Sequence, residues 1–163
     1  MTKKNHSTLS LVEELNGIEQ EARMILPGIQ TLFGFQLIVG LNPSFKQSVT
    51  LVEQYLHLTS ILLVTISGVL VVAPAAYHRQ VRGGFSKRLL ETSSRFLTIA
   101  LVPLALGTSL DLYLVTRIMG ESRIAALIIS SLVFLLYIGV WFVYPRLKSN
   151  SMAELLEVEV PHE

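Results

Sequence analysis

The 163-residue sequence contains no cysteine, which excludes disulfides, thiolate catalysis, cysteine-ligated zinc and iron–sulfur clusters. Charged residues are also few, at 15% of the chain, whereas a soluble domain carries about 25%. The histidines lack the spacing of metal ligands; they are His6, His57, His78 and His162. We therefore expect neither a metal site nor a cofactor.

Motifs for catalysis and for ion selection are missing as well. The sequence has no glycine-rich phosphate loop, no H-E-x-x-H zinc motif and no G-x-S-x-G nucleophile elbow. It has no potassium-channel filter and no regular arginine repeat of a voltage sensor. Nothing in it favours nucleic-acid binding. We therefore predict that the protein is not an enzyme and binds no nucleic acid.

What the sequence does contain is four long apolar runs, which cover residues 24–41, 55–77, 96–116 and 124–144. A helix of about 20 residues crosses the roughly 30 Å hydrocarbon core of a bilayer. The second and fourth runs have no Asp, Glu, Lys or Arg, and the third has only Asp111. These runs predict an all-α membrane protein in which four transmembrane helices form a bundle over residues 24–144.

Lysine and arginine are distributed unevenly between the connections. Ten lie before the first run, between the second and third, or after the fourth, and only three lie in the other two connections. Positively charged residues accumulate on the cytoplasmic side of membrane proteins. We therefore predict that both termini and the central loop are cytoplasmic.

Two segments outside the apolar runs have recognisable patterns. Residues 1–23 predict an amphipathic helix that opens at the capping box Ser10–Glu13, and Pro27 is expected in the first turn of the next span. Because the polar face of this helix is acidic, we expect it to pack on protein near the basic segment 79–95 rather than on lipid. The alternative is a solvated helix that only leads into the first span. Residues 145–163 form an acidic tail.

Asp111 is the most informative residue inside the runs, because a carboxylate at the centre of a span costs about 2.5–3.5 kcal/mol on insertion scales. Antiparallel spans place Gln36, His57 and Asp111 at a similar depth near the outer ends of their helices. Arg117 and Arg123 in the third connection are also within reach of Asp111. Two interpretations stay open: a proton- or ion-responsive site, or an interhelical hydrogen bond that holds the helices in register.

Two stretches of sequence resemble a known family. The run from Leu26 to Leu37, with the pattern P-G-x-Q-x-L-F-x-F-x-L, and the element A-P-A-A-Y-H-R at residues 73–79 are similar to an uncharacterised family of small four-span bacterial membrane proteins. This resemblance implies the four-span topology and a location in the bacterial inner membrane. It implies no activity.

The resemblance also directs attention to the inner side of the membrane. The residues concerned there are Gln30, Tyr77, His78 and Arg79. They either anchor the topology and contact lipid headgroups, or form a cytoplasmic-side site. The basic residues of the central loop are expected to set the topology or to contact headgroups; they are Arg82, Lys87, Arg88 and Arg95.

These observations lead to two expectations about function. The first is a non-enzymatic protein with a structural or accessory role, embedded in the lipid bilayer and acting by helix packing, either as a homo-oligomer or as a subunit of a larger membrane complex. The alternative is a small oligomeric ion or proton channel or transporter, with Asp111 and His57 in its pathway.

Overall fold

The computed structural model describes residues 2–80 and 87–148, and every secondary-structure element in these ranges is helical. The elements are α1 (Thr2–Leu41), α2 (Pro43–Ser48), α3 (Leu51–Gln80), α4 (Lys87–Ile118), α5 (Arg123–Ile138) and the π-helical turn η1 (Gly139–Val143). Four stretches are long and apolar enough to cross a membrane: Glu13–Leu41, Leu51–Gln80, Lys87–Ile118 and Arg123–Lys148. The prediction of an all-α membrane protein with four spanning helices is confirmed.

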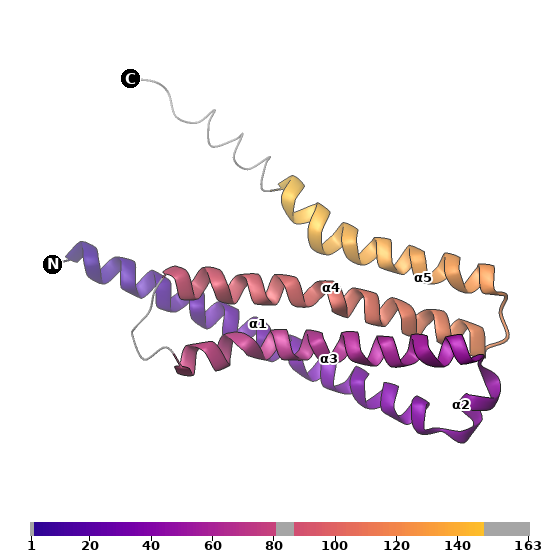
Figure 1. Ribbon diagram of the computed structural model, residues 1–163. Helices are drawn as coiled ribbons and strands as arrows, with labels where there is room; N and C mark the ends of the chain where they lie inside the picture. The colour runs from indigo at the N-terminus through magenta and orange to yellow at the C-terminus, as the bar shows by residue number, and fades with distance from the viewer. Residues whose placement is uncertain (1, 81–86, 149–163) are drawn as a thin grey trace.

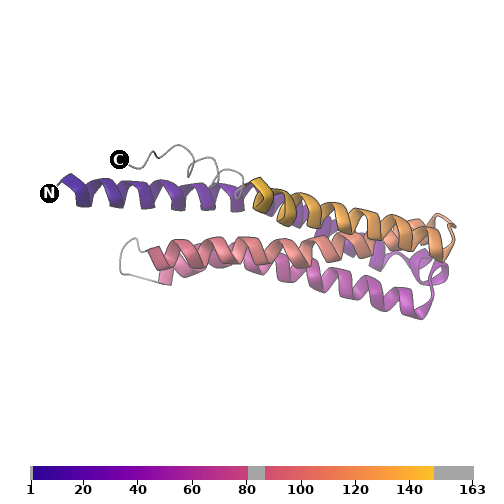
Figure 2. The same cartoon turned by 90° about the horizontal axis from the view of Figure 1, so that it is seen from above.

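The long helices lie roughly side by side, with α4 in the centre of the arrangement (Figure 1). Helix α4 packs against α1, α3 and α5, and its contact with α3 is the most extensive in the bundle. Helix α1 packs on both α3 and α4, whereas α5 packs mainly on α4. Both views show that the N-terminal end of α1 extends past the ends of α3 and α4 (Figures 1 and 2).

Small residues allow α3 and α4 to approach closely. A Cβ atom added at Gly107 would lie 2.8 Å from the Cγ2 atom of Val64 and 3.2 Å from the carbonyl oxygen of Ser60. Nearby, the hydroxyl of Ser67 donates a hydrogen bond of 2.8 Å to the carbonyl oxygen of Ala100 on α4. Close backbone approach over small residues is the usual way in which helices associate in membranes.

The first helix differs from two of the predictions made from sequence. It begins at Thr2 rather than at the capping box of Ser10, and it continues without a break to Leu41. Pro27 therefore lies inside a helix and not in a first turn. The backbone before Ser10 is itself helical, and Pro27 removes only the backbone hydrogen bond to the carbonyl of Arg23.

The N-terminal part of α1 packs on protein. Leu15 is buried, and a cavity of about 130 Å³ beside it is lined by residues of α1, α3 and α4. The carboxylate of Glu19 lies 3.7 Å from Nδ1 of His78, close to the end of α3. This contact favours the interpretation that the segment docks on the bundle. Residues 81–86 and the predicted tail beyond residue 148 lie outside the described residues.

Candidate functional site

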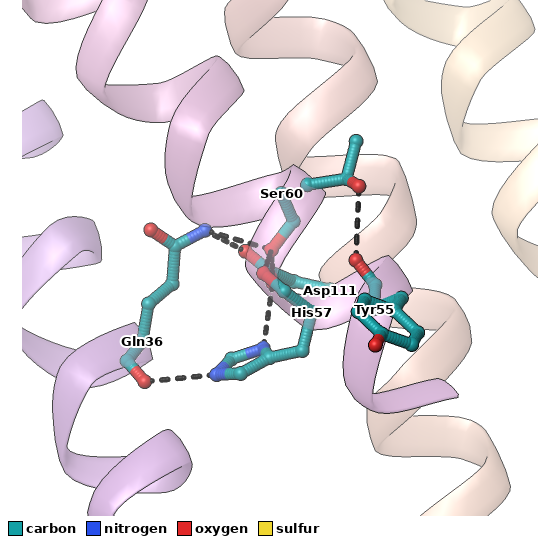
Figure 3. A network of polar contacts seen from close by, with 6 residues as sticks. Gln36, Tyr55, His57, Ser60 and Asp111 are labelled. Atoms are coloured by element: carbon teal, nitrogen blue, oxygen red, sulfur yellow. Dashed lines mark hydrogen bonds and ion pairs between the residues drawn. The ribbon is translucent and has the colours of Figure 1, made fainter. Parts of the chain in front are cut away.

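Four polar side chains from three helices meet inside the bundle, and we call them the polar layer: Gln36 on α1, His57 and Ser60 on α3, and Asp111 on α4 (Figure 3). The side-chain amide of Gln36 donates to Oδ2 of Asp111 at 2.6 Å, and the hydroxyl of Ser60 donates to Oδ1 at 2.5 Å. The amide nitrogen of Gln36 also lies 3.2 Å from the hydroxyl oxygen of Ser60. The carboxylate of Asp111 thus joins α1, α3 and α4.

The prediction that Gln36, His57 and Asp111 share one level is confirmed. Ser60 was not among the residues predicted for this site, although it stands three positions after His57 and hence on the same face of α3. That spacing is the signal that sequence reasoning missed. One turn of α3 therefore supplies two of the four members of the polar layer.

The ring of His57 is oriented by its backbone contact. Its Nε2 atom lies 3.0 Å from the carbonyl oxygen of Gln36. Because a carbonyl only accepts, Nε2 carries the hydrogen, and in the neutral ring Nδ1 is then an acceptor. Nδ1 lies 3.8 Å from Oδ1 of Asp111. The ring of Phe45 on α2 lies against the imidazole, with 4.9 Å between ring centroids.

The polar layer is buried at Gln36 and His57, whereas the side chain of Asp111 is 18% exposed. Gln36 is 3% exposed and His57 5% exposed. Among the described residues, the Oε1 atom of Gln36 has no hydrogen-bond partner. A cavity of about 150 Å³ lies beside the layer and is lined by Gln36, His57, Asp111 and apolar residues such as Leu114. The arrangement can hold three helices in register, and it can hold a proton between His57 and Asp111.

Arg117 does not reach Asp111, contrary to the sequence-based expectation. Its Nε atom donates instead to Oε1 of Glu53 at 2.8 Å, and Glu53 is buried. Six residues along α4 separate Arg117 from Asp111, which is about 9 Å of helix. Arg123, at the start of α5, is exposed. Asp111 is therefore paired with His57 and not with an arginine.

Glu53 was also missed from the sequence, although it had a signal. Thr50 and Glu53 form a T-x-x-E capping box at the start of α3. The backbone N–H and the hydroxyl of Thr50 donate to Oε2 of Glu53 at 2.8 and 2.9 Å. The second carboxylate oxygen is left for Arg117, so one side chain both caps α3 and ties it to α4.

Comparison with known proteins gives a family but no activity. A family model described as "Family of unknown function (DUF6328)" matches residues 11–145. The chain belongs to this family. The match includes the whole polar layer, the pair Glu53–Arg117 and all of α3, α4 and α5. No curated protein and no solved structure matches the chain.

In this member of DUF6328, the predicted inner-side residues do not gather into one site. Gln30 and Tyr77 line an open groove of about 740 Å³ between α1 and α3. His78 and Arg79 line a different cavity, of about 280 Å³, together with Glu19. Consecutive residues of a helix point about 100° apart, so Tyr77 and His78 face different sides of α3.

The basic residues predicted for the central loop are placed only in part. Lys87, Arg88 and Arg95 are exposed on the first turns of α4, and Arg82 lies outside the described residues. Their assignment to topology or to lipid headgroups stays a prediction. Within residues 2–80 and 87–148, no group of three or more metal-ligating side chains comes together.

Proposed function

We propose that this is a non-enzymatic membrane protein with a structural or accessory role, which acts by helix packing with copies of itself or with a larger membrane complex. We place it in the bacterial inner membrane, with both termini in the cytoplasm. The observation that carries the proposal is a contrast between two parts of the bundle. Polar side-chain contacts hold α1, α3 and α4 together, whereas most of the surface of α5 is exposed.

The polar layer is the set of contacts that holds α1, α3 and α4 together. The carboxylate of Asp111 accepts hydrogen bonds from Gln36 on α1 and Ser60 on α3, so a rotation or shift of any one of the three helices would break an interhelical hydrogen bond. Polar side chains that bond across helices hold membrane bundles in register. The hydrogen bonds therefore hold α1, α3 and α4 in one fixed arrangement.

Helix α5 provides the free surface. Only Ala126 and Ser130 of this helix are buried. Its large apolar side chains are exposed over most of its circumference; they include Ile124, Leu127, Ile128, Leu132, Leu135 and Leu136. In a membrane such a surface faces lipid or the helices of another protein. Because α5 packs mainly on one helix, α4, most of its apolar surface is free to contact a partner.

The experiment is native mass spectrometry of the protein extracted from its own membrane in mild detergent. We expect a homo-oligomer of fixed stoichiometry or a defined complex with another membrane protein. The double variant Ile128→Trp and Leu132→Trp should dissociate it. The matched control is Leu62→Trp and Ile66→Trp, which places the same bulk with the same spacing on the exposed face of α3. A monomer, or an assembly that both double variants leave intact, would refute the proposal.

A second candidate is the small oligomeric ion or proton channel or transporter. The observation that favours it is the spacing of 3.8 Å between His57 Nδ1 and Asp111 Oδ1, beside a cavity of about 150 Å³ that both residues line. Proton exchange between an imidazole and a carboxylate at this spacing supplies the relay step that a conductor needs.

Reconstitution of the pure protein in vesicles distinguishes the two candidates. A conductor should dissipate an imposed proton or cation gradient, and Asp111→Asn should abolish the flux. Ser130→Ala is the control, because among the described residues the Ser130 hydroxyl donates within its own helix, to the carbonyl of Leu127. A protein that passes no ions in either form excludes the conductor and leaves the accessory role.

A further inference from the structure

The polar layer lies much closer to one end of the bundle than to the other. Asp111 stands seven residues, or about 10 Å, before the end of α4 at Ile118, and 24 residues, or about 36 Å, after its start at Lys87. We call the closer end the near end: α1 and α4 stop there, and α3 begins there (Figure 1). Solvent therefore has a short way to the layer from the near end and a long one from the far end.

Two cavities touch the polar layer, and both extend toward the near end. The cavity of about 150 Å³ is lined by His57 and Asp111 and continues along α4 to Ile118. A second cavity, of about 250 Å³, is lined by His57, by Phe45 of α2 and by Leu41, the last residue of α1. The space beside the histidine therefore continues toward the near end.

Charged groups also lie between the layer and the near end. Glu53 stands one turn before His57 on α3, and Arg117 stands six residues after Asp111 on α4. Their side chains form an ion pair of 2.8 Å, in which the side chain of Arg117 is 22% exposed. A charged pair that is in part exposed thus precedes the layer on this side.

On its far side the polar layer is closed by apolar packing. One turn before Asp111, Gly107 approaches α3 so closely that an added Cβ atom would lie 2.8 Å from Cγ2 of Val64. The hydroxyl of Ser67, deeper in this packing, already donates to the carbonyl oxygen of Ala100 at 2.8 Å. Within the described residues, the lining of the open groove between α1 and α3 contains no member of the polar layer. A buried apolar cluster follows toward the far end and separates it from the layer: Ile29, Val64, Val71, Leu97 and Ala100.

A neutral histidine leaves an unfavourable contact inside the layer. Because Nε2 of His57 carries the hydrogen that faces the carbonyl oxygen of Gln36, Nδ1 presents a lone pair toward Oδ1 of Asp111 at 3.8 Å. A proton taken up at Nδ1 converts this contact between two acceptors into an ion pair between α3 and α4. The proton also cancels the charge of the carboxylate, and a paired charge is less costly to bury than a single one. Proton uptake should therefore hold α3 and α4 together more firmly.

Other charged or titratable groups on the surrounding helices are paired or exposed. Glu53 and Arg117 are bonded to each other, and Tyr113 interacts with Arg117. The last 18 residues of α1 contain no charged residue, and the charged residue of α5 is Arg123, exposed at its first position. On α2, the side chain of Lys46 lies outside the described part of the structure. The carboxylate of the layer is therefore the counter-ion that the structure places beside the imidazole.

We propose that the polar layer is a proton sensor that exchanges its proton with solution at the near end only. His57 binds the proton at Nδ1, and the resulting ion pair with Asp111 tightens the packing of α3 on α4. The sensor rests on the proposed accessory role, because the proton changes the packing of the helices and does not cross the bundle. With both termini in the cytoplasm, the near end faces the outside of the cell.

The first test measures access to the layer from each side. Because the chain has no cysteine, single substitutions give unique thiols. Leu114→Cys lines the cavity of about 150 Å³, and Leu104→Cys is the matched control, ten residues toward the far end and packed on the apolar cluster. Glu121→Cys, which follows the end of α4, identifies the side of the near end. The probe is a small charged methanethiosulfonate, which reacts with the thiolate that forms where water is present.

We expect Leu114→Cys to react at least tenfold faster from the near-end side than from the other side. Leu104→Cys should react at least tenfold more slowly than Leu114→Cys from the near-end side, and equally slowly from the other. Val115→Cys, which lines the same cavity, takes the place of Leu114→Cys if that variant does not fold. Equal rates for Leu104→Cys and Leu114→Cys would overturn the proposal, and so would reaction of Leu114→Cys from the far side alone or from neither side.

The second test measures the response to protons. Reversible unfolding of the protein in mixed micelles is compared at about pH 8 and about pH 5, the interval in which histidine changes its charge. We expect the lower pH to shift the unfolding equilibrium of the wild type at least threefold toward the folded state. Asp111→Asn should remove this gain. His78→Gln is the matched control and should keep it, since His78 lies beside Glu19 and outside the layer.

His57→Gln replaces Asp111→Asn if that variant does not fold. The absence of a gain in the wild type, or a full gain in the variant of the layer, would overturn the proposal. A proton flux through vesicles that depends on Asp111 would also overturn it, in favour of a conductor. The accessory role is measured separately, by native mass spectrometry of the assembly at one pH, so its failure and the failure of the sensor are distinguishable.

Discussion

Replacing Asp111 by alanine tests the polar layer most directly. The substitution removes two acceptor oxygens, which receive hydrogen bonds of 2.6 Å from Gln36 and 2.5 Å from Ser60. It also leaves the buried amide of Gln36 with only the hydroxyl of Ser60 as a side-chain acceptor, at 3.2 Å. The structure therefore predicts a loss of folding stability and not only a loss of one contact.

The size of this loss follows from known hydrogen-bond energies. Interhelical hydrogen bonds in membrane proteins contribute about 0.6 kcal/mol on average and up to about 1.7 kcal/mol. A buried donor left without its partner costs a further 1–3 kcal/mol or so. We expect Asp111→Ala to lower the free energy of unfolding by about 2–4 kcal/mol, which is roughly a 30- to 700-fold change in the unfolding equilibrium. Asp111→Asn keeps one acceptor and should lose about half as much.

The assay is reversible unfolding in mixed micelles, followed by helical circular dichroism. Ser130→Ala on α5 is the control, and it should change the unfolding free energy by less than about 0.5 kcal/mol because its hydroxyl bonds within one helix. A triple variant with Gln36→Leu, Ser60→Ala and Asp111→Leu should be closer to wild type than Asp111→Ala, since it removes the two donors of Gln36 and Ser60 together with their acceptor.

The reasoning would be wrong if Asp111→Ala unfolded at the same point as wild type, or later. That result would mean that the desolvation cost of the carboxylate equals or exceeds the energy of its bonds in the folded bundle. A triple variant less stable than Asp111→Ala would also contradict the argument, because it would show that packing rather than hydrogen bonding stabilises the folded bundle at this site.

Three further predictions concern other parts of the molecule. Gly107→Ala should lower the free energy of unfolding by about 1–3 kcal/mol, because the added Cβ would overlap α3. Gly34→Ala is the control: no atom lies within 4 Å of its added Cβ, so thermal unfolding should show unchanged or higher stability. Glu53→Gln should cost about 1–3 kcal/mol in the same assay, since it weakens a buried ion pair and a cap, and an unchanged midpoint would contradict this. Because the chain has no cysteine, Glu121→Cys and Gln80→Cys give unique labels; an impermeant maleimide should label the first in intact cells and the second only after permeabilisation, and the reverse pattern would overturn the predicted orientation.

The sequence by itself was enough for the number of membrane-spanning helices, although not for the short helix α2. The length of an apolar run is a one-dimensional property, and it must match the thickness of the membrane, so four runs predict four spanning helices. Their ends were less well predicted, because residues beyond each apolar run continue the helix; α4 already begins at Lys87, nine residues before the third run. Pro27 shows the same limit, since a helix continues through a proline when the chain on both sides is helical.

The candidate site was predicted in outline. Helix direction and depth are enough to bring Gln36, His57 and Asp111 to one level, because each position along a span translates into a distance across the membrane. Direction and depth do not give the rotation of each helix about its own axis. It decides that Ser60 joins the carboxylate and that Arg117 turns to Glu53 instead.

Sequence alone therefore determined that this is a four-span helical membrane protein, because the length of each apolar run must match the thickness of the membrane. It also determined that the third span contains a carboxylate. Only the tertiary structure decided what that carboxylate touches, since Gln36 and Asp111 are 75 residues apart and meet through the packing of α1 on α4. It also decided that Tyr77 and His78 face different cavities, and that small residues on α3 leave a groove. Contacts between helices depend on which faces interlock, and close packing over small residues selects one such arrangement.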